Sequence, residues 1–360
     1  MNDRAFMQRA LFHAQRAQGL TTPNPMVGAV VVTPDGVVAG QGRHPRAGAA
    51  HAEVLALDEA GGRARGATLY VTLEPCRHQG RTGPCTRRII DAGIARVVAA
   101  MPDPNPLMNG LGFADLRAAG IQVDVGLLAE EAARTNRAFV IVQTLGRPMI
   151  IVKAATSLDA RIASAPGVRT EISSRQANRR TQQLRAAVDA IAVGSGTVLA
   201  DDPLLTVREC YRARPLPRVI FDRRLRTPTT ARLFSTLDRG PVIILTTDSH
   251  EPAAAERARA LAGAGATIAW GSGELGADLA KLLTWDISCV LLEGGAEIHA
   301  AAWQAGVVDR VHLIVAPDSL GEAGVKLFAG LPVPLSQMVP VRVETIGPDA
   351  WMEADVYGHY

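Results

Sequence analysis

Apolar and polar positions in the first 125 residues alternate between short strands and amphipathic helices. Apolar runs at 27–32 and 37–42 flank Thr33-Pro34-Asp35-Gly36, a sequence typical of a turn between two strands. Further strands are predicted at 67–73, 96–100 and 121–125, and helices at 3–17, 51–62, 85–93 and 111–119. This alternation predicts a largely parallel sheet flanked by helices.

The pattern starts again after Leu145-Gly146-Arg147-Pro148. A strand is predicted at 149–155, a helix at 174–187, and a strand at 190–193 that leads into Gly194-Ser195-Gly196-Thr197. Further strands are predicted at 218–222, 242–247, 267–270, 288–292 and 311–316, with helices between most of them. A chain of 360 residues exceeds the usual size of one domain. We therefore expect two α/β domains, 1–147 and 148–360.

Composition argues against a membrane protein, a secreted disulfide-rich protein and a nucleic-acid-binding protein. No run of 18 apolar residues is present, so no membrane span is predicted, and the N-terminus has no apolar signal-peptide core. Four cysteines do not suggest a disulfide scaffold, so we expect a cytoplasmic enzyme. Only 4% of the residues are aromatic, and there is no aromatic interleaving of the kind that binds nucleic acid.

Positive charge is concentrated in one part of the second half. Between Arg169 and Arg226 there are 12 Arg and 6 acidic residues, whereas the whole chain carries a net charge of only +3. Guanidinium groups bind phosphate in a bidentate manner, so this excess suits a phosphate-bearing ligand. A solvated, Arg-rich surface explains the same composition equally well.

One stretch combines the residue types of a zinc-dependent hydrolytic site: His51-Ala52-Glu53, then Pro75-Cys76, then Cys85. One His and two Cys supply three zinc ligands and leave a fourth tetrahedral position for water. Zinc lowers the pKa of that water to about 7, and Glu53 can take its proton and pass it to a leaving amine. These parts predict the hydrolytic deamination of an amino-heterocycle. The alternative is that these residues form no metal site, the two cysteines being unrelated core residues and the histidine being near them in sequence by chance.

With these motifs the chain resembles the bifunctional deaminase/reductase family of riboflavin biosynthesis, over nearly its whole length. The first domain matches at Pro23-Asn24-Pro25, at His51-Ala52-Glu53-Val54 and at the longer run from Thr72 through Glu74-Pro75-Cys76 to Pro84-Cys85. The second domain matches at Lys153-x-x-x-Ser157-Leu158-Asp159, Gly196-Thr197 through Asp201-Asp202-Pro203, Leu205-Thr206-Val207-Arg208 and Glu293-Gly294-Gly295.

The resemblance implies a cytidine-deaminase-like three-layer domain followed by a dihydrofolate-reductase-like α/β domain. The first would remove an amino group from a diaminopyrimidinone ribosylamino phosphate. The second would reduce the ribosyl group to ribityl with NADPH. A phosphorylated pyrimidine substrate and a homo-oligomer are therefore expected, with no nucleic acid or membrane as partner.

The resemblance also implies roles for individual residues. In the first domain, His51, Cys76 and Cys85 would bind one zinc, Glu53 would shuttle protons, and the substrate would contact Asn24, His44, His78 and Arg81. In the second, substrate contacts would fall on Arg169, Arg185, Leu205, Arg208 and Glu293, and cofactor contacts on Ala155, Glu171, Thr197, Asp201, Arg223 and 295–301, beginning at Gly295. Arg185 and Arg208 can clamp the ribose phosphate, and Lys153 can polarise or protonate near the sugar.

Two other interpretations remain open at this point. The zinc deaminase could act on a free base, a nucleoside or tRNA, with an accessory phosphate-binding second domain. Such deaminases typically carry Pro-Cys-x-x-Cys, whereas eight residues separate Cys76 from Cys85 here. Alternatively the zinc could be structural and the chain a binding module. A structural site should offer a fourth ligand nearby, and only His78 is a candidate.

Overall fold

The computed structural model describes residues 2–77, 83–247, 251–332 and 337–356. The chain divides into two compact units, Met1–Gly146 and Arg147–Tyr360. Within the described parts, no helix is both long enough and apolar enough to cross a membrane.

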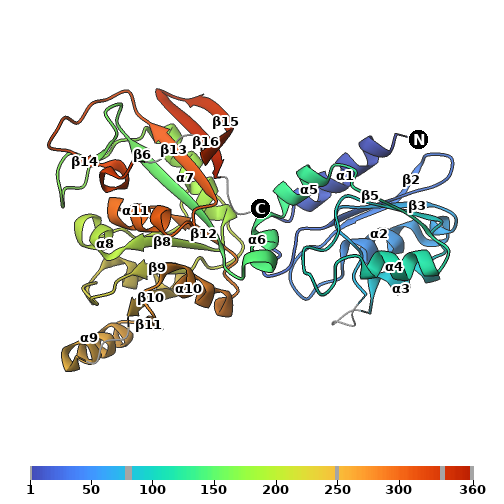
Figure 1. The fold of residues 1–360 in the computed structure, drawn as a ribbon, viewed down its shortest axis with the longest axis horizontal. Coiled ribbons are helices and arrows are strands. Elements are labelled where there is room, and N and C mark those ends of the chain that lie inside the picture. The colour runs from blue at the N-terminus through green and yellow to red at the C-terminus, as the bar shows by residue number, and fades with distance from the viewer. Residues whose placement is uncertain (1, 78–82, 248–250, 333–336, 357–360) are drawn as a thin grey trace. The chain divides into compact units, whose positions relative to one another are not determined.

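The N-terminal unit is a five-stranded sheet with helices on both faces (Figure 1). Its strands are β1 (Gly28–Val32), β2 (Val38–Arg43), β3 (Thr68–Val71), β4 (Arg96–Ala99) and β5 (Gln122–Val125), in the order β2-β1-β3-β4-β5. Its helices are α1 (Asp3–Gln15), α2 (Ala52–Ala60), α3 (Cys85–Asp91), α4 (Leu111–Ala118), α5 (Ala129–Thr135) and α6 (Arg137–Leu145), with a 3₁₀ turn at Gly61–Ala64. Helices α1 and α5 cover one face, and α2, α3 and α4 cover the other.

The sheet of this unit is mixed rather than largely parallel. Strand β1 pairs in antiparallel fashion with both β2 and β3, whereas β3–β4 and β4–β5 are parallel. The short turn at 33–36 forces β1 and β2 to run in opposite directions. The connection through α2 places β3 on the other side of β1, in the direction of β2, so β3 is antiparallel to β1 as well. Helices α3 and α4 then join neighbouring strands that run parallel. Parallel order is therefore limited to the half of the sheet that α3 and α4 connect.

Glycines allow the helices to lie unusually close to this sheet. A Cβ atom on Gly28 of β1 would stand 1.9 Å from the carbonyl oxygen of Ala10 in α1. On the other face, a Cβ on Gly42 of β2 would stand 2.4 Å from the carbonyl oxygen of Ala52 in α2. Backbone thus packs on backbone on both faces, and the position of α2 matters because its first turn carries His51 and Glu53.

The C-terminal unit is built on a nine-stranded sheet in the order β11-β10-β9-β8-β12-β6-β13-β16-β15. Its elements are β6 (Met149–Thr156), β7 (Arg161–Ala163), α7 (Arg175–Ala187), β8 (Ala190–Gly194), α8 (Ser195–Asp201), β9 (Arg218–Phe221), η2 (Arg232–Arg239), β10 (Val242–Thr247), α9 (Pro252–Gly263), β11 (Ala266–Gly271), α10 (Leu275–Ala280), η3 (Lys281–Trp285), β12 (Cys289–Leu292), α11 (Ala296–Gln304), β13 (Arg310–Val315), β14 (Val325–Lys326), η4 (Leu327–Gly330), β15 (Met338–Ile346) and β16 (Asp349–Val356). Neighbouring strands from β11 to β13 are parallel, and β16 and β15 add an antiparallel edge.

Apolar clusters on the two faces of this sheet form its core. One cluster joins β8, β9 and β10 to α8 and α9. A second, on the opposite face, joins β6, β8 and β12 to α10, η3 and α11. The parallel α/β arrangement follows the alternation of strands and helices predicted from the sequence, whereas the small β7–β14 ladder and the β15–β16 hairpin were not predicted.

The close packing at Gly28 can be tested by substitution. We expect Gly28→Ala to destabilise the N-terminal unit by about 1–3 kcal/mol, because the added methyl group meets backbone that cannot move aside. Chemical denaturation followed by circular dichroism measures the effect. Gly62→Ala is the matched control, since a Cβ there has no atom within 4 Å. Equal stability of the two variants would contradict the packing argument.

Candidate active sites

Three potential metal ligands converge in the N-terminal unit. His51 immediately precedes α2, Cys85 is the first residue of α3, and Cys76 lies in the loop after β3. The Nδ1 atom of His51 lies 3.2 Å from the sulfur of Cys85 and 3.4 Å from that of Cys76. All three ligand atoms lie within 4.8 Å of one another. One imidazole nitrogen and two sulfurs at this spacing fit zinc.

The surroundings of Cys76 favour its thiolate form. A hydrogen bond with the Cys85 thiol lowers the pKa of Cys76 to about 4, against the opposing effect of burial. The backbone N–H of Cys85 also points at this sulfur, with 3.4 Å between the nitrogen and Sγ. Since the thiolate is the form that binds metal, the loop after β3 presents this ligand ready for a cation.

Glu53 lies in the first turn of α2, and only 3% of its surface is exposed. Burial raises the pKa of Glu53 to about 7, and the negative charge of Cys76 adds to the effect. A carboxyl group whose pKa lies near neutrality can both accept and release a proton at pH 7. The position of Glu53 beside the ligands therefore suits a proton carrier.

His44 lies next to His51, and Asn24 contacts His44. The His44 ring is 2% exposed and stands edge-on to the His51 ring, with 5.4 Å between their centroids. Nδ1 of His44 lies 3.1 Å from the carbonyl oxygen of Ala50, and Nε2 lies 3.1 Å from Nδ2 of Asn24. Facing a carbonyl oxygen, Nδ1 carries the proton, so Nε2 accepts from the Asn24 amide. The two other residues predicted on this rim, His78 and Arg81, lie outside the described residues.

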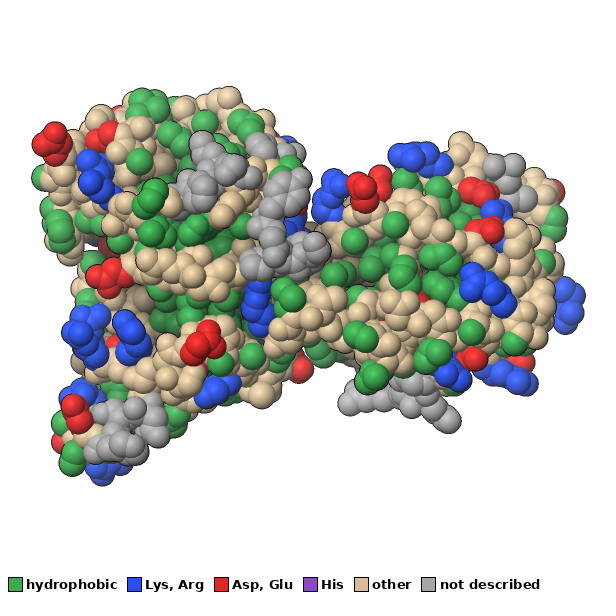
Figure 2. Space-filling model, in the orientation of Figure 1, with side chains coloured by type: hydrophobic (Ala, Val, Ile, Leu, Met, Phe, Trp, Pro, Cys, Tyr) green, Lys and Arg blue, Asp and Glu red, His purple; other side chains and the backbone are tan. Residues whose placement is uncertain are grey.

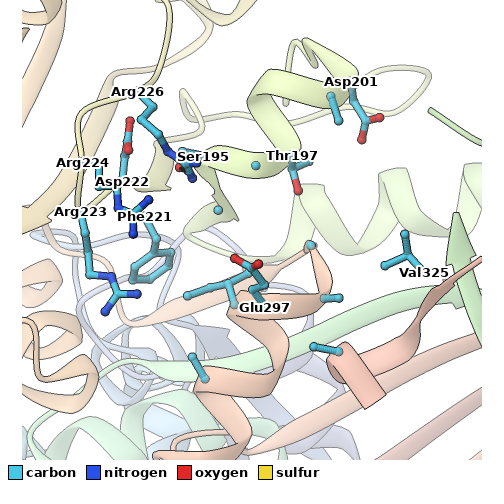
Figure 3. Close-up of a pocket in the computed structure, with 18 of the residues that line it drawn as sticks. Ser195, Thr197, Asp201, Phe221, Asp222, Arg223, Arg224, Arg226, Glu297 and Val325 are labelled. Atoms are coloured by element: carbon cyan, nitrogen blue, oxygen red, sulfur yellow. Dashed lines mark hydrogen bonds between the residues drawn. The ribbon is translucent and has the colours of Figure 1, made fainter. Parts of the chain in front are cut away.

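A cavity of about 1110 Å³ opens in the C-terminal unit. Figure 2 shows this face hollowed, with hydrophobic side chains in the hollow and Lys or Arg side chains at its rim. The cavity is lined by α8, the ends of β9 and β10, the start of α11 and the segment 162–170. In Figure 3, Arg223, Arg224 and Arg226 stand on one side of it, and Thr197 and Glu297 face it from α8 and α11.

The cavity collects most of the predicted cofactor contacts. Its lining includes Thr197, Asp201, Arg223 and Gly295, but not Ala155 or Glu171. Ala155 is partly buried on β6, where it packs against an apolar cluster with α7. Glu171 is an exposed residue that pairs with Arg169, with 3.5 Å between the charged groups.

Two arginines that were not predicted also line the cavity. Arg224 and Arg226 follow Arg223 in the loop after β9, and Arg226 donates a hydrogen bond of 3.0 Å to the hydroxyl of Ser195. The Arg-rich composition of 169–226 was visible in the sequence, but composition could not show which of these arginines lie at the cavity. A polar, cationic rim and the first turn of α11 together fit a dinucleotide phosphate.

Two of the substrate contacts predicted for this unit, Arg185 and Glu293, lie with Lys153 in a second group of residues. Glu293 follows β12 and Lys153 lies on the adjacent strand β6, so the two stand side by side in the parallel register. Arg185 of α7 donates from Nε and from one terminal nitrogen to the Glu293 carboxylate, each at 2.6 Å. Its other terminal nitrogen donates to the carbonyl oxygen of Thr206 at 3.0 Å.

These contacts alter the electrostatics of the group. Burial by itself raises the pKa of Glu293, but the Arg185 guanidinium and the neighbouring Lys153 hold it below its usual value. Burial lowers the pKa of Lys153, whereas Glu293 opposes that change. Lys153 is partly buried, and a lysine with a lowered pKa beside a carboxylate is suited to giving up a proton.

The remaining predicted contacts differ in accessibility. Arg208 is exposed, and its backbone N–H is fixed by the side chain of Gln182 at 2.8 Å. Arg169 is exposed as well, at 62% of its side chain. Leu205 is 3% exposed and packs in an apolar cluster with β8 and β9, so only its backbone is placed to meet a polar ligand.

Comparison with known proteins identifies both units. Residues 1–101 match the family model described as the cytidine and deoxycytidylate deaminase zinc-binding region, and residues 148–352 match the RibD C-terminal domain. The riboflavin biosynthesis protein RibD of Aquifex aeolicus is 42% identical over 321 residues, covering 89% of this chain and 88% of that protein. RibD of Escherichia coli K12 is 42% identical over 337 residues, with 89% of each chain covered. This chain belongs to the RibD family.

Solved structures agree with this assignment. RibD of Acinetobacter baumannii has a TM-score of 0.88 at 35% identity, and covers 99% of both chains. A deaminase/reductase from Thermotoga maritima has a TM-score of 0.85 at 33% identity, with the same coverage. The predicted fold class and the predicted activities, a zinc-dependent deaminase and an NADPH-dependent reductase of riboflavin biosynthesis, are thereby confirmed.

The division of labour between Glu53 and the ligands can be tested directly. We expect Glu53→Gln to retain zinc, because Glu53 is not one of the three convergent ligands, and to lose deaminase activity, because an amide cannot carry the proton. Metal analysis and a deamination assay measure the two properties, with Cys85→Ala as the variant that should lose zinc. Loss of zinc from Glu53→Gln would show that the roles are assigned incorrectly.

Proposed function

We propose that the N-terminal unit deaminates a diaminopyrimidinone ribosylamino phosphate and that the C-terminal unit reduces the deaminated product to its ribityl form. The observation that carries this proposal is that each unit has its own complete group of residues: His51, Glu53, Cys76 and Cys85 in one, and Lys153, Glu293 and the cavity at α8 in the other. The Thermotoga maritima relative is named for the same two activities.

In the deaminase, His51, Cys76 and Cys85 would hold zinc, which supplies the activation of the attacking water. Glu53 then takes a proton from that water and delivers it to the amino group that leaves as ammonia. The pyrimidine carbon gains a C–O bond and loses a C–N bond. His44 and Asn24 are placed to orient the substrate, because their hydrogen bond fixes both side chains beside the ligand His51.

In the reductase, the cavity would hold NADPH, which supplies the hydride. Its phosphates would meet Arg223 and the backbone at Gly295, where α11 begins. Reduction of the ribosyl group opens the sugar ring, so the ring oxygen must gain a proton. We assign this proton to Lys153, with Glu293 beside it to stabilise the ammonium form before transfer.

The two predicted phosphate ligands are placed differently. All three guanidinium nitrogens of Arg185 already have partners within the protein, so this residue orients Glu293 in the structure. Arg208 instead presents an exposed side chain from a backbone held by Gln182. We therefore propose Arg208 as the principal phosphate contact and Arg185 as a contact reached only if it leaves Glu293.

The substrate and both reactions can be tested in one experiment. Purified protein is incubated with the diaminopyrimidine phosphate, with and without NADPH, and the products are identified by mass. We expect the deaminated ribosylamino product without NADPH and the ribityl product with it. Deamination of cytidine or of free bases, with no turnover of the phosphorylated substrate, would contradict the proposal.

Arg208→Lys should reduce the reductase kcat/KM by about tenfold to a hundredfold, which corresponds to about 1.5–3 kcal/mol. The reason is that an ammonium group cannot reproduce the two parallel hydrogen bonds of a guanidinium to phosphate. Steady-state kinetics of both reactions measures the effect, and deaminase activity should not change. Arg179→Lys, in an exposed pair with Glu209, is the control. An unchanged reductase kcat/KM in Arg208→Lys would remove Arg208 from the site.

The units should also work separately, because the residues of each proposed site come from one unit only. A fragment that ends at Gly146 should deaminate, and one that begins at Arg147 should reduce the deaminated intermediate. Each fragment is assayed with its own substrate, and size-exclusion chromatography with light scattering reports whether it forms the expected homo-oligomer. Folded fragments of the native oligomeric state that lack activity would contradict separate sites.

A further inference from the structure

Glu74 takes no part in the chemistry proposed above, yet its carboxylate is buried among backbone donors. Only 6% of the residue is exposed. Oε2 accepts from the N–H groups of Asp103 at 3.0 Å and Gly110 at 2.9 Å. Oε1 accepts from Gly112 at 2.7 Å and Phe113 at 3.3 Å. One side chain thus fastens both ends of the segment 103–113.

Two of these donors belong to the first turn of α4, whose preceding residue is Gly110. The first N–H groups of a helix have no partner within the helix, and the helix dipole favours a negative charge there. The Glu74 side chain, which is not part of α4, accepts from two of these N–H groups and places its acceptor oxygens at the positive end of the helix dipole. The acceptor oxygens of this buried side chain are thus satisfied by four backbone N–H groups, and no arginine or lysine is among the partners given by these hydrogen bonds.

The same contact reaches the metal ligand through the backbone. A Cβ atom on Gly112 would stand 2.2 Å from the carbonyl oxygen of Pro75, the residue between Glu74 and Cys76. The start of α4 therefore lies directly on the peptide that leads into the ligand. On its other side, Cys76 is fixed by α3: its carbonyl oxygen accepts from the N–H of Thr86 at 3.1 Å.

We propose that Glu74 is a positioning residue of the metal centre: by clamping α4 onto Pro75, it fixes the backbone that presents the Cys76 thiolate. Zinc binds its ligand atoms at well-defined distances, so a clamp that fixes the ligand's backbone sets metal affinity as well as stability. Residues that hold a ligand without touching the metal commonly contribute about tenfold to a hundredfold in affinity. The proposal rests on Cys76 being a zinc ligand.

Glu74→Gln is the sharpest variant because glutamine has the same shape. Its amide has one oxygen, so its NH₂ group would face two of the four N–H donors that the carboxylate satisfies. We expect zinc affinity to fall by about tenfold to a hundredfold. Affinity is measured on the metal-free full-length protein by competition with a chromophoric chelator. Absorption of the Co²⁺-substituted protein reports the geometry of the site.

Glu59→Gln provides the matched control. Glu59 also accepts a backbone N–H, that of Gln41 at 2.9 Å, but it is exposed and lies near the far end of α2. We expect its zinc affinity and Co²⁺ spectrum to equal those of the wild type. Reductase activity, measured in every variant, reports whether the C-terminal unit remains intact.

A second variant tests the clamp from the other side. Gly112→Ala keeps the Glu74 side chain itself, but its methyl group would stand 2.2 Å from the Pro75 carbonyl oxygen and 3.1 Å from Oε1 of Glu74. It therefore pushes α4 away from Pro75 and Glu74 together, and should lower zinc affinity and alter the Co²⁺ spectrum in the same direction as Glu74→Gln. If either variant is less stable yet binds zinc like the wild type, Glu74 is a structural residue only and the proposal is wrong. If the wild type itself binds no zinc, the assignment of Cys76 fails instead.

Discussion

The deaminase centre depends on how closely α2 packs against the antiparallel pair β1–β2. Cβ atoms on Gly40 and Gly42 would lie 2.2 Å and 2.4 Å from carbonyl oxygens of α2. Ordinary contacts need more than 3.4 Å, so any side chain at these positions would displace the helix by about 1 Å. That is several times the range of about 0.2 Å within which zinc–ligand distances are expected to lie. His51 immediately precedes this helix and Glu53 lies in its first turn, so a shift would move the proposed ligand and the proposed proton carrier together.

Short motifs were enough to predict which residues of the N-terminal unit come together. The residues His51, Glu53, Cys76 and Cys85 are each close to a predicted strand end or helix start, and the structure brings the three ligands together there. The clamp at Glu74 was not predicted, although Glu74 lies two residues before Cys76. Its partners are backbone N–H groups 29 to 39 residues away. Nearly every residue has such a group, so residue type does not reveal which of them will meet the side chain.

The reductase half was predicted less completely for a different physical reason. Its antiparallel edge is rich in charge: Glu353 and Asp355 of β16 both pair with Arg310 of β13. Pro340 in β15 also weakens any prediction of a strand. Likewise, the sequence could not separate Arg185, which is engaged with Glu293, from the exposed Arg208. Both are arginines in the same cationic stretch, and only tertiary contacts make one of them a partner of Glu293 and leave the other exposed.

The junction between the units has a consequence for protein engineering. Gly146 ends α6 in the left-handed conformation, with φ of 65°. Immediately afterwards, Arg147 is buried in a double hydrogen-bonded ion pair with Asp309, which also accepts from the N–H of Ile150. The start of the second unit is thus held in place by contacts that lie within that unit, beginning at its first residue. A linker inserted between Gly146 and Arg147 would remove neither partner of this ion pair, because both lie in the second unit, and the junction is therefore a suitable place to exchange one unit for another.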